Sequence, residues 1–457
     1  MGERGYVSMP GLGNLYVGAR STAGVGTFIY KTQDGGLTTF MNESVSTKEF
    51  LNKLPNRVKV GVDLNEQILG IGFHAWGGFN TLGISVRSDV NFSMPNELFK
   101  FMKESNDSHY KLKNINITST NFAEIAFGHA REINDNLTVG AKLKALVGLA
   151  KATVRIDQMD LHVSGDRWSI TPKGAEAYVS AKGLIIPTKG ETRNYQEDDY
   201  ELDLDGNRTD VLKEGTNDQI DYDGVDFDDN NIGPTGFGMA IDLGATYRLN
   251  DEWSFSASII DLGFISWKNT VKGTMTKTFE FDGFKDVPFE DTDDNKENKL
   301  DNQVDKIVDD LADMAKFDKA GEGMKRTTAL AATLHLGAQY TLPAYDRLNF
   351  GFLSTTRIQG VNTWTEARIS ANVAPISWFE ASLNYALSNF GSTAGLMLNF
   401  HPRGFNFFLA ADMPMCKYEP AYFAPISRAQ VNVNMGINFT FGPKHKRKYK
   451  VTEVQSL

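Results

Sequence analysis

Apolar and polar residues alternate along much of this chain. From Phe237 to Leu249 every second residue is apolar, and the residues between them are mostly small or polar. Because successive side chains point to opposite faces of a strand, this pattern predicts long strands with one apolar face. The same pattern, in places weaker, predicts strands at 58–64, 69–75, 82–86, 137–149, 330–340, 379–387, 405–411 and 431–441.

Short connections alternate with longer ones. The short ones are rich in Gly, Pro, Asn and Asp, and they lie at 77–78, 134–136, 250–252, 343–347, 375–377 and 401–404. This alternation places the short turns at one end of the sheet and the long loops at the other. Counting strands back from residue 441 gives about 14, provided that residues 157–180 and 269–283 extend the long-loop side without crossing. An even number puts both chain ends on the short-turn side, as bacterial outer-membrane barrels require.

These features favour an all-β fold, a transmembrane antiparallel β-barrel, over a soluble sandwich. Strands of ten or more residues suit an oblique membrane crossing, whereas strands of sandwiches are usually shorter. The polar face is rich in Gly, Ser, Asn and Gln, as expected for a lumen. Five tryptophans fall at predicted strand ends, where an aromatic girdle would place them: Trp76, Trp253, Trp267, Trp364 and Trp378.

The net charge of −10 is an average over unlike parts. Residues 191–230 carry −12 and residues 280–322 carry −9, which leaves +11 for the remainder. Such concentrated charge cannot be packed into a core, so both segments are expected to be solvated loops at the outer end. They serve either as solubilising loops or in cation binding. Neither has EF-hand spacing, and the single Cys416 excludes a disulfide framework, so we expect no defined metal site and no cofactor.

Three short segments have helical periodicity. Residues 300–317 form an amphipathic pattern inside an acidic loop, either packed over the barrel mouth or forming a docking face for a partner. A helix is expected after Ser46, with Glu49 completing a capping box and Pro55 ending it. A third helix at 95–103 is expected to expose an apolar side to lipid headgroups or a hydrophobic ligand. The apolar residues of the first and third helices are Val304, Ile307, Val308 and Leu311, and Leu98, Phe101 and Met102.

Three regions are predicted along the chain. Residues 1–56 are rich in glycine and are expected to form a hatch-like plug, because glycine lets the backbone pack tightly. Residues 57–441 form the barrel, and residues 442–457 form a basic periplasmic tail. The extracellular loops are expected at about 92–113, 151–235 and 269–326.

Charged and amide side chains on the polar strand faces are the candidate site residues. In a barrel they point into the lumen, where they form either a satisfied polar network or a substrate path. They are Lys142, Lys144, Asp242, Arg248, His335, Gln339, Asn432 and Asn434. No His-Glu-x-x-His or Gly-x-Ser-x-Gly motif is present, so we predict no catalytic residues and no enzyme activity. The basic tail has no aromatic platform beyond Tyr449, which argues against nucleic-acid binding.

Four segments carry a family resemblance. They are Arg4–Asn14, Ala75–Asn80, Ser85–Ser88 and Ile260–Trp267. In these segments the chain resembles an outer-membrane barrel family of Bacteroidota, which is similar in architecture to the long-chain fatty-acid transporter (FadL-like) barrels. The resemblance implies 14 strands, an N-terminal hatch and the bacterial outer membrane.

The leading hypothesis is an outer-membrane barrel that passes or captures a small hydrophobic or amphipathic molecule. The alternative is a non-transporting subunit of a larger outer-membrane complex, such as barrel-assembly or secretion machinery. The expected partners are therefore outer-membrane lipid, a hydrophobic small molecule and other outer-membrane proteins.

Overall fold

The computed structural model describes residues 5–31, 36–42, 44–104, 109–164, 167–203, 207–281, 316–419 and 424–442. The predicted helix at 300–317, including Val304, Ile307, Val308 and Leu311, lies almost entirely outside the described residues, as does the tail beyond residue 442. None of the helices in the described ranges is long and apolar enough to cross a membrane.

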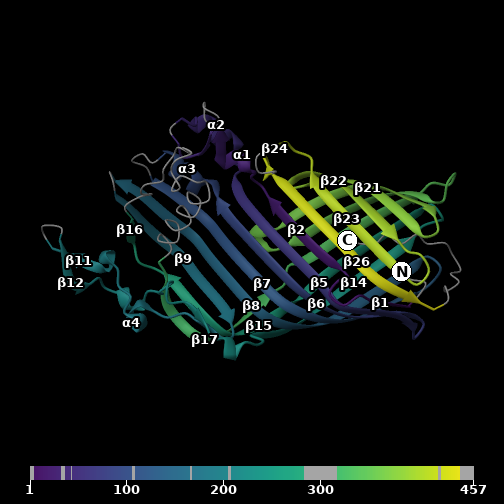
Figure 1. Ribbon diagram of the computed structural model, residues 1–457, viewed down its shortest axis with the longest axis horizontal. Coiled ribbons are helices and arrows are strands. Elements are labelled where there is room, and N and C mark those ends of the chain that lie inside the picture. Colours follow the sequence, from purple (N-terminus) through teal and green to yellow (C-terminus); the bar gives the residue numbers. More distant parts are fainter. Residues whose placement is uncertain are drawn as a thin grey trace.

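Antiparallel strands close into a 14-stranded barrel, which confirms the predicted fold (Figure 1). Each strand of the ring pairs with the next, and β26 closes the ring on β2. In ring order the strands are β2 (Leu15–Ser21), β5 (Arg57–Ala75), β6 (Gly78–Pro95), β7 (His109–Glu132), β8 (Leu137–Ser164), β14 (Gly236–Arg248), β15 (Trp253–Met275), β18 (Ala332–Thr341), β19 (Leu348–Ile358), β20 (Trp364–Ile376), β21 (Phe379–Ser388), β22 (Gly391–Phe400), β23 (Asn406–Pro414) and β26 (Ala429–Phe441).

The six predicted short turns join consecutive ring strands at the same end of the barrel, which we call the inner end. Two of these turns use the same device. The Asn134 side chain accepts hydrogen bonds from the backbone N–H groups of Asn136 and Leu137, and Asn250 does the same for Glu252 and Trp253. Asparagine thus replaces a backbone partner where the chain reverses.

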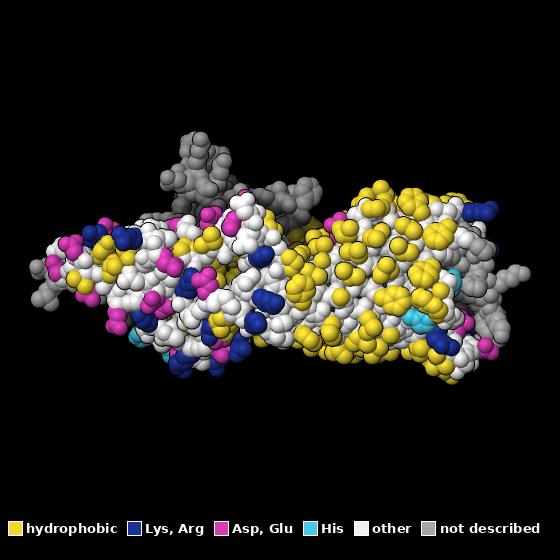
Figure 2. All heavy atoms as spheres, turned by 90° about the horizontal axis from the view of Figure 1, so that it is seen from below, with side chains coloured by type: hydrophobic (Ala, Val, Ile, Leu, Met, Phe, Trp, Pro, Cys, Tyr) yellow, Lys and Arg dark blue, Asp and Glu magenta, His cyan; other side chains and the backbone are white. Residues whose placement is uncertain are grey.

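Apolar side chains cover the outer surface of the ring, and Figure 2 shows them crowded on one half of the molecule. Phe237 and Met239 are 56% and 63% exposed, as the alternation along β14 predicts. A band of exposed apolar side chains on a closed barrel matches the hydrocarbon layer of a membrane. The protein is therefore an outer-membrane barrel.

Only part of the predicted tryptophan girdle lies on this surface. Trp76, Trp253 and Trp378 are exposed near the inner end. Trp267 is buried instead, and the ring of Trp364 lies 5.5 Å from the Arg20 guanidinium. Position near a strand end did not distinguish lipid-facing from inward-facing tryptophans, because that distinction depends on strand parity.

The N-terminal segment forms part of the barrel wall. β1 (Gly5–Ser8) and β2 lie between β26 and β5 and pair with both. The prediction of a plug is therefore wrong for residues 5–8 and 15–21. Residues 57–75 form the single strand β5, although the sequence predicted two strands there. The predicted count of 14 still agrees with the structure, because the strand β2 was not predicted.

On one side of the barrel the wall extends beyond the complete ring at the outer end. The outer halves of β7 and β8 continue beyond the ring, and β9 (Arg167–Ala181) pairs with the outer half of β8. This pairing confirms that residues 157–180 extend the wall without crossing. The upper half of β15 pairs with β9 and β17 (Asp318–Ala329). The predicted loops at 92–113, 151–235 and 269–326 therefore begin and end with residues that belong to strands. The short β16 (Phe279–Phe281) continues the β9 edge.

Helices cover the apolar face of this extension, which lies beyond the lipid-facing band. Along β5, Val60 and Val62 are exposed, whereas Val58 on the same face is buried with Phe50 and Leu54. The covering segment contains α1 (Val25–Phe28), β3 (Ile29–Lys31), β4 (Leu37–Thr39), α2 (Thr47–Lys53) and, after β6, α3 (Asn96–Glu104).

This cover corrects two predictions. Leu98, Phe101 and Met102 on α3 are buried in that cluster rather than exposed, because they pack against the strand extension. α2 begins after Ser46 as predicted, but the Ser46 side chain makes no capping hydrogen bond. Glu49 pairs with Lys53 at 2.8 Å instead of completing a capping box.

An acidic arm projects from the outer end between β9 and β14. It contains β10 (Leu184–Ile185), α4 (Lys189–Thr192), η1 (Glu197–Asp199), β11 (Tyr200–Leu202), β12 (Arg208–Leu212), η2 (Thr216–Asp218), β13 (Asp226–Phe227) and η3 (Asp229–Asn231). Thr188 and Glu191 form a capping box on α4. The Thr188 backbone N–H, with help from Lys319, lowers the pKa of Glu191 below its usual value. The remaining short elements are η5 (Gly360–Asn362), β24 (Tyr418–Glu419) and β25 (Ala424–Pro425).

Candidate functional site

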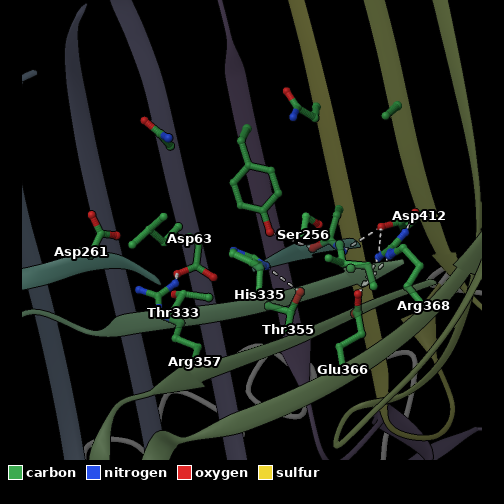
Figure 3. Close-up of a pocket in the computed structure, with 18 of the residues that line it drawn as sticks. Asp63, Ser256, Asp261, Thr333, His335, Thr355, Arg357, Glu366, Arg368 and Asp412 are labelled. Atoms are coloured by element: carbon green, nitrogen blue, oxygen red, sulfur yellow. Dashed lines mark hydrogen bonds and ion pairs between the residues drawn. The ribbon is translucent and has the colours of Figure 1, made fainter. Parts of the chain in front are cut away.

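The barrel lumen holds a cavity of about 1080 Å³, lined by the inward faces of the ring strands (Figure 3). Its lining combines acidic, basic, amide and hydroxyl side chains with a smaller number of apolar ones. Three groups of ion pairs and one apolar patch divide this surface.

The first ionic group joins β6, β7, β8, β14 and β15. Arg87 donates to both carboxylate oxygens of Asp261 at 2.8 and 2.7 Å, and Lys144 contacts Asp261 at 2.7 Å. Lys144 also lies 2.8 Å from Asp242 and 3.6 Å from Glu124. The Asp261 and Lys144 side chains are almost completely buried, so the centre of this group is shielded from water.

A β-bulge aims Asp261 into that group. Ile260 and Asp261 together lie opposite the single residue Asp242 on β14. Asp261 has a φ of 61°, a left-handed conformation that aspartate tolerates better than most residues. Its backbone N–H donates to the Asp242 carboxylate at 2.8 Å. Bulges often redirect a side chain in this way.

The second ionic group lies between β20 and β23. Arg368 contacts Glu366 at 2.9 Å and Asp412 at 2.8 Å, and the Asn432 amide donates to Asp412 at 3.1 Å. Gln430 donates to the second oxygen of Glu366 at 3.0 Å. Figure 3 shows this group as a separate cluster along the cavity wall.

The third ionic group crosses the lumen at the outer end of the ring. Arg357 on β19 contacts Asp63 at 3.1 Å and Asp89 at 2.7 Å, although β5 and β6 lie on the far side of the ring. Arg20 pairs with Asp63 as well and donates to Asn91 at 2.7 Å. Figure 3 shows Arg357 reaching Asp63.

An apolar patch lies beside the first ionic group. Trp267 is completely buried there with Leu146 and Ile265, and its indole N–H donates to Thr328 at 2.9 Å. Gly148 makes room for the indole, because a Cβ at that position would lie 2.5 Å from the ring. Phe122 and Leu330 belong to the same patch and line the cavity.

A short loop folds into the lumen from the wall. Residues 9–14 join β1 to β2, and Asn14 lines the cavity. The Gly13 carbonyl accepts a hydrogen bond from Asn438, which shares the inward face of β26 with Asn434. This loop is the part of the predicted plug that enters the lumen.

The eight predicted lumen residues differ in position. Lys144 and Asp242 belong to the first ionic group, and Lys142 lies 4.0 Å from Asp242. His335 contacts the Thr355 hydroxyl at 3.0 Å and lines the cavity, as do Gln339, Asn432 and Asn434. Arg248 lies at the inner end, where its carbonyl accepts from Asn136.

Sequence reasoning missed the residues that bind these groups together: Arg20, Asp63, Arg87, Asp89, Asp261, Arg357, Glu366, Arg368 and Asp412. In the sequence, each of these residues could have been recognised as a charged residue at an inward-facing position of a strand whose other face is apolar. Asp412, for example, shares the inward parity of Ala410 on β23.

Comparison with solved structures finds many matches, among them three barrels with 8–10% sequence identity. The toluene transporter TbuX of Ralstonia pickettii has 8% identity and a TM-score of 0.40, with 97% of this chain and 90% of that chain covered. The toluene transporter TodX of Pseudomonas putida has 9% identity and a TM-score of 0.39, with 96% and 89% covered. A FadL homologue of Pseudomonas aeruginosa has 10% identity and a TM-score of 0.37, with 96% and 90% covered.

The search of curated proteins finds no match. A family model matches residues 1–412, which include the N-terminal wall strand, the ring as far as β23 and the strand extension. The chain belongs to the family of unknown function DUF5723.

Proposed function

We propose that this protein is an outer-membrane channel or binding protein for small amphipathic or hydrophobic molecules. The observation that carries the proposal is the lumen cavity of about 1080 Å³, whose walls join a buried apolar patch to charged and amide side chains. Ligand sites in proteins have this composition: an apolar lining with a few placed polar groups, and a volume of about 300–1,000 Å³.

The two kinds of surface would act on different parts of one molecule. Phe122 and Leu330 would contact an apolar body, because removing its surface from water is favourable. The neighbouring hydroxyl and amide groups would hydrogen-bond to a polar end. Carboxylates that are already paired with Arg87 or Arg368 offer little further attraction, so a strongly charged ligand is not required.

Binding of a neutral fluorophore tests the proposal. The protein is reconstituted in lipid nanodiscs and titrated with 1-aminoanthracene, with empty nanodiscs subtracted. We expect saturable fluorescence enhancement, which octanol displaces. Leu330→Asn is expected to weaken binding at least tenfold, because it places an amide in the apolar patch.

Val211→Asn is the matched control, since Val211 lies exposed on β12 of the arm, away from the lumen. It should bind as the unchanged protein does. Absence of saturable binding, or equal affinity of both variants and the unchanged protein, would overturn the proposal.

A second candidate function is that of a non-transporting subunit in a larger outer-membrane complex. The ion pairs that Arg357 makes across the lumen favour it, because they tie opposite walls of the barrel together. Recovery of the protein with a stoichiometric partner in mild detergent, together with no fluorophore binding, would support this candidate over the first.

A further inference from the structure

The outer end of the lumen is crossed by side chains that belong to one short segment. This segment, residues 357–363, ends β19 and leads through η5 to β20. Besides the two ion pairs of Arg357, Gln359 donates to Asp89 at 2.8 Å. Asn362 donates to Asn116 at 3.1 Å. Every one of these partners lies on β5, β6 or β7, across the ring from β19.

The crossing contacts lie where the complete ring ends. β19 stops at Ile358 and β20 begins at Trp364, whereas β5, β6 and β7 continue outward into the extension. Asp63, Asp89, Arg357 and Gln359 all line the cavity. The crossing therefore forms part of the cavity wall at the outer end of the ring.

Lys151 differs from the other cations near this crossing. Arg20, Arg87, Lys144, Arg357 and Arg368 each have a carboxylate within ion-pair distance. Lys151 lines the same cavity, and its ammonium donates to the Thr120 hydroxyl at 2.6 Å. Within the described part of the chain, no carboxylate lies within ion-pair distance of it.

Asp89 on β6 lies directly opposite Thr120 on β7, and Thr120 lies directly opposite Lys151 on β8, so Asp89 is the acidic group nearest in register to Lys151 across Thr120. A buried charge that loses its partner is costly unless another replaces it. If Arg357 moves away, Lys151 can supply a positive charge to Asp89, so the departure of Arg357 need not leave that carboxylate uncompensated. The crossing thus has two electrostatically reasonable arrangements, one with Arg357 on Asp89 and one with Lys151 on Asp89.

We propose that residues 357–363 form a gate at the outer end of the lumen, closed by Arg357 on Asp63 and Asp89 and opened as Lys151 replaces Arg357 at Asp89. This inference rests on the proposed function, because a gate has meaning only where a molecule enters the lumen. It assigns Arg357 as the residue that holds the lumen closed and Lys151 as the residue that compensates the charge of Asp89 on opening.

Ion conductance in planar bilayers with potassium chloride tests the gate. Arg357→Ala is expected to raise the conductance at least tenfold over that of the unchanged protein. Lys151→Met is expected to lower the frequency of opening events severalfold, since residue 151 can then no longer supply a positive charge to Asp89. Arg155→Met is the matched control, because Arg155 on the same strand pairs with the exposed Asp157 at 2.7 Å in the extension, away from the crossing, and its loss should leave opening unchanged.

A reversible cross-link tests the gate within one folded protein. In a Cys416→Ser, Arg357→Ala background, Asn116→Cys and Asn362→Cys are joined by a short bis-methanethiosulfonate reagent. We expect conductance to return to the level of the unchanged protein and to rise again when dithiothreitol releases the link. A monofunctional methanethiosulfonate on the same variant should have little effect.

Equal conductance of Arg357→Ala and the unchanged protein, or equal conductance before and after cross-linking, would overturn the gate. The binding measurement with 1-aminoanthracene separates this result from failure of the proposed function. Saturable binding without any effect of the cross-link means that the lumen is a binding site whose access does not depend on residues 357–363. Absence of binding refutes the proposed function, whatever the conductance.

Discussion

At the scale of single residues, the lumen is organised by charged groups placed on the polar faces of strands. Lys144 and Asp242 could be predicted, because their strands alternate clearly and both share the polar parity. Their partner Asp261 could not, because the bulge at Ile260 and Asp261 breaks the alternation that parity reasoning needs. Arg357 could not be paired with Asp89, because contact across a lumen depends on the ring closure.

Removing Asp261 should strongly destabilise the barrel. In Asp261→Ala, Arg87 and Lys144 lose their closest carboxylate while both remain inside the lumen. Breaking a buried pair by removing one partner costs about 3–5 kcal/mol. Urea unfolding of the barrel refolded in detergent, followed by tryptophan fluorescence, measures the free energy of unfolding.

Glu49→Gln is the comparison for Asp261→Ala. It removes the exposed pair with Lys53 on α2 and should change the free energy of unfolding by less than about 0.5 kcal/mol. Equal effects of the two substitutions would show that the lumen pairs contribute no more than a surface pair.

Gly436 allows the lumen loop to approach β26. A Cβ at this position would lie 2.3 Å from the Gly13 carbonyl oxygen, which is backbone and has little freedom to move. Gly436→Ala should therefore cost about 1–3 kcal/mol through overpacking. Gly83→Ala is the matched control in another ring strand, because its Cβ would meet nothing closer than 3.5 Å. The same urea titration compares them, and equal stability of both would contradict the close approach of loop and strand.

At the scale of elements, the N-terminal strand shows where composition misled. Glycine content suggested a plug, but Leu15, Val17 and Ala19 alternate with Tyr16, Gly18 and Arg20 as a wall strand does. The run is short and the loop at residues 9–14 separates it from β1, so its parity stood out less than that of longer strands. For α3, the sequence indicated an apolar face, but it did not indicate that this face packs against the strand extension.

Val17→Lys tests the place of β2 in the wall. Val17 is 42% exposed on the outer surface of the ring, so a lysine there would face lipid. A lysine on the lipid face of a barrel costs about 2–4 kcal/mol near the bilayer midplane. Refolding yield into lipid vesicles, read as heat-modifiable migration on a gel, should fall sharply.

Ser21→Lys is the control for the wall strand, because Ser21 lies at the outer end of β2. It should refold normally. If Val17→Lys refolds as well as Ser21→Lys, residue 17 does not face lipid and the wall assignment is wrong.

At the scale of the whole molecule, the ring and its outer additions obey different constraints. Strand length, turn placement and parity predicted the ring, because a membrane imposes one apolar face on every strand. The sequence indicated the extension only indirectly, because a count of 14 requires that residues 157–180 and 269–283 do not cross the membrane. The apolar face of the extension is covered by protein, and its loops carry no periodic signal. The charge pattern placed the acidic segments outside but could not show that residues 184–231 contain their own short paired strands.

The arm should be separable from the ring, because none of its paired strands belongs to the barrel sheet. A Cβ at Gly183 would lie 3.2 Å from the Asn231 carbonyl oxygen, so the two ends of the arm are close together and a short Gly-Ser linker can replace residues 184–231. We expect this variant to refold with normal heat-modifiable migration. Its extension should become sensitive to trypsin, because Ile186 and Ile220 of the arm pack with Val271 and Met275 on the wall. The full-length variant Ile220→Asp should gain the same sensitivity while keeping the arm. Loss of refolding in the shortened protein would mean instead that the arm is needed to close the ring.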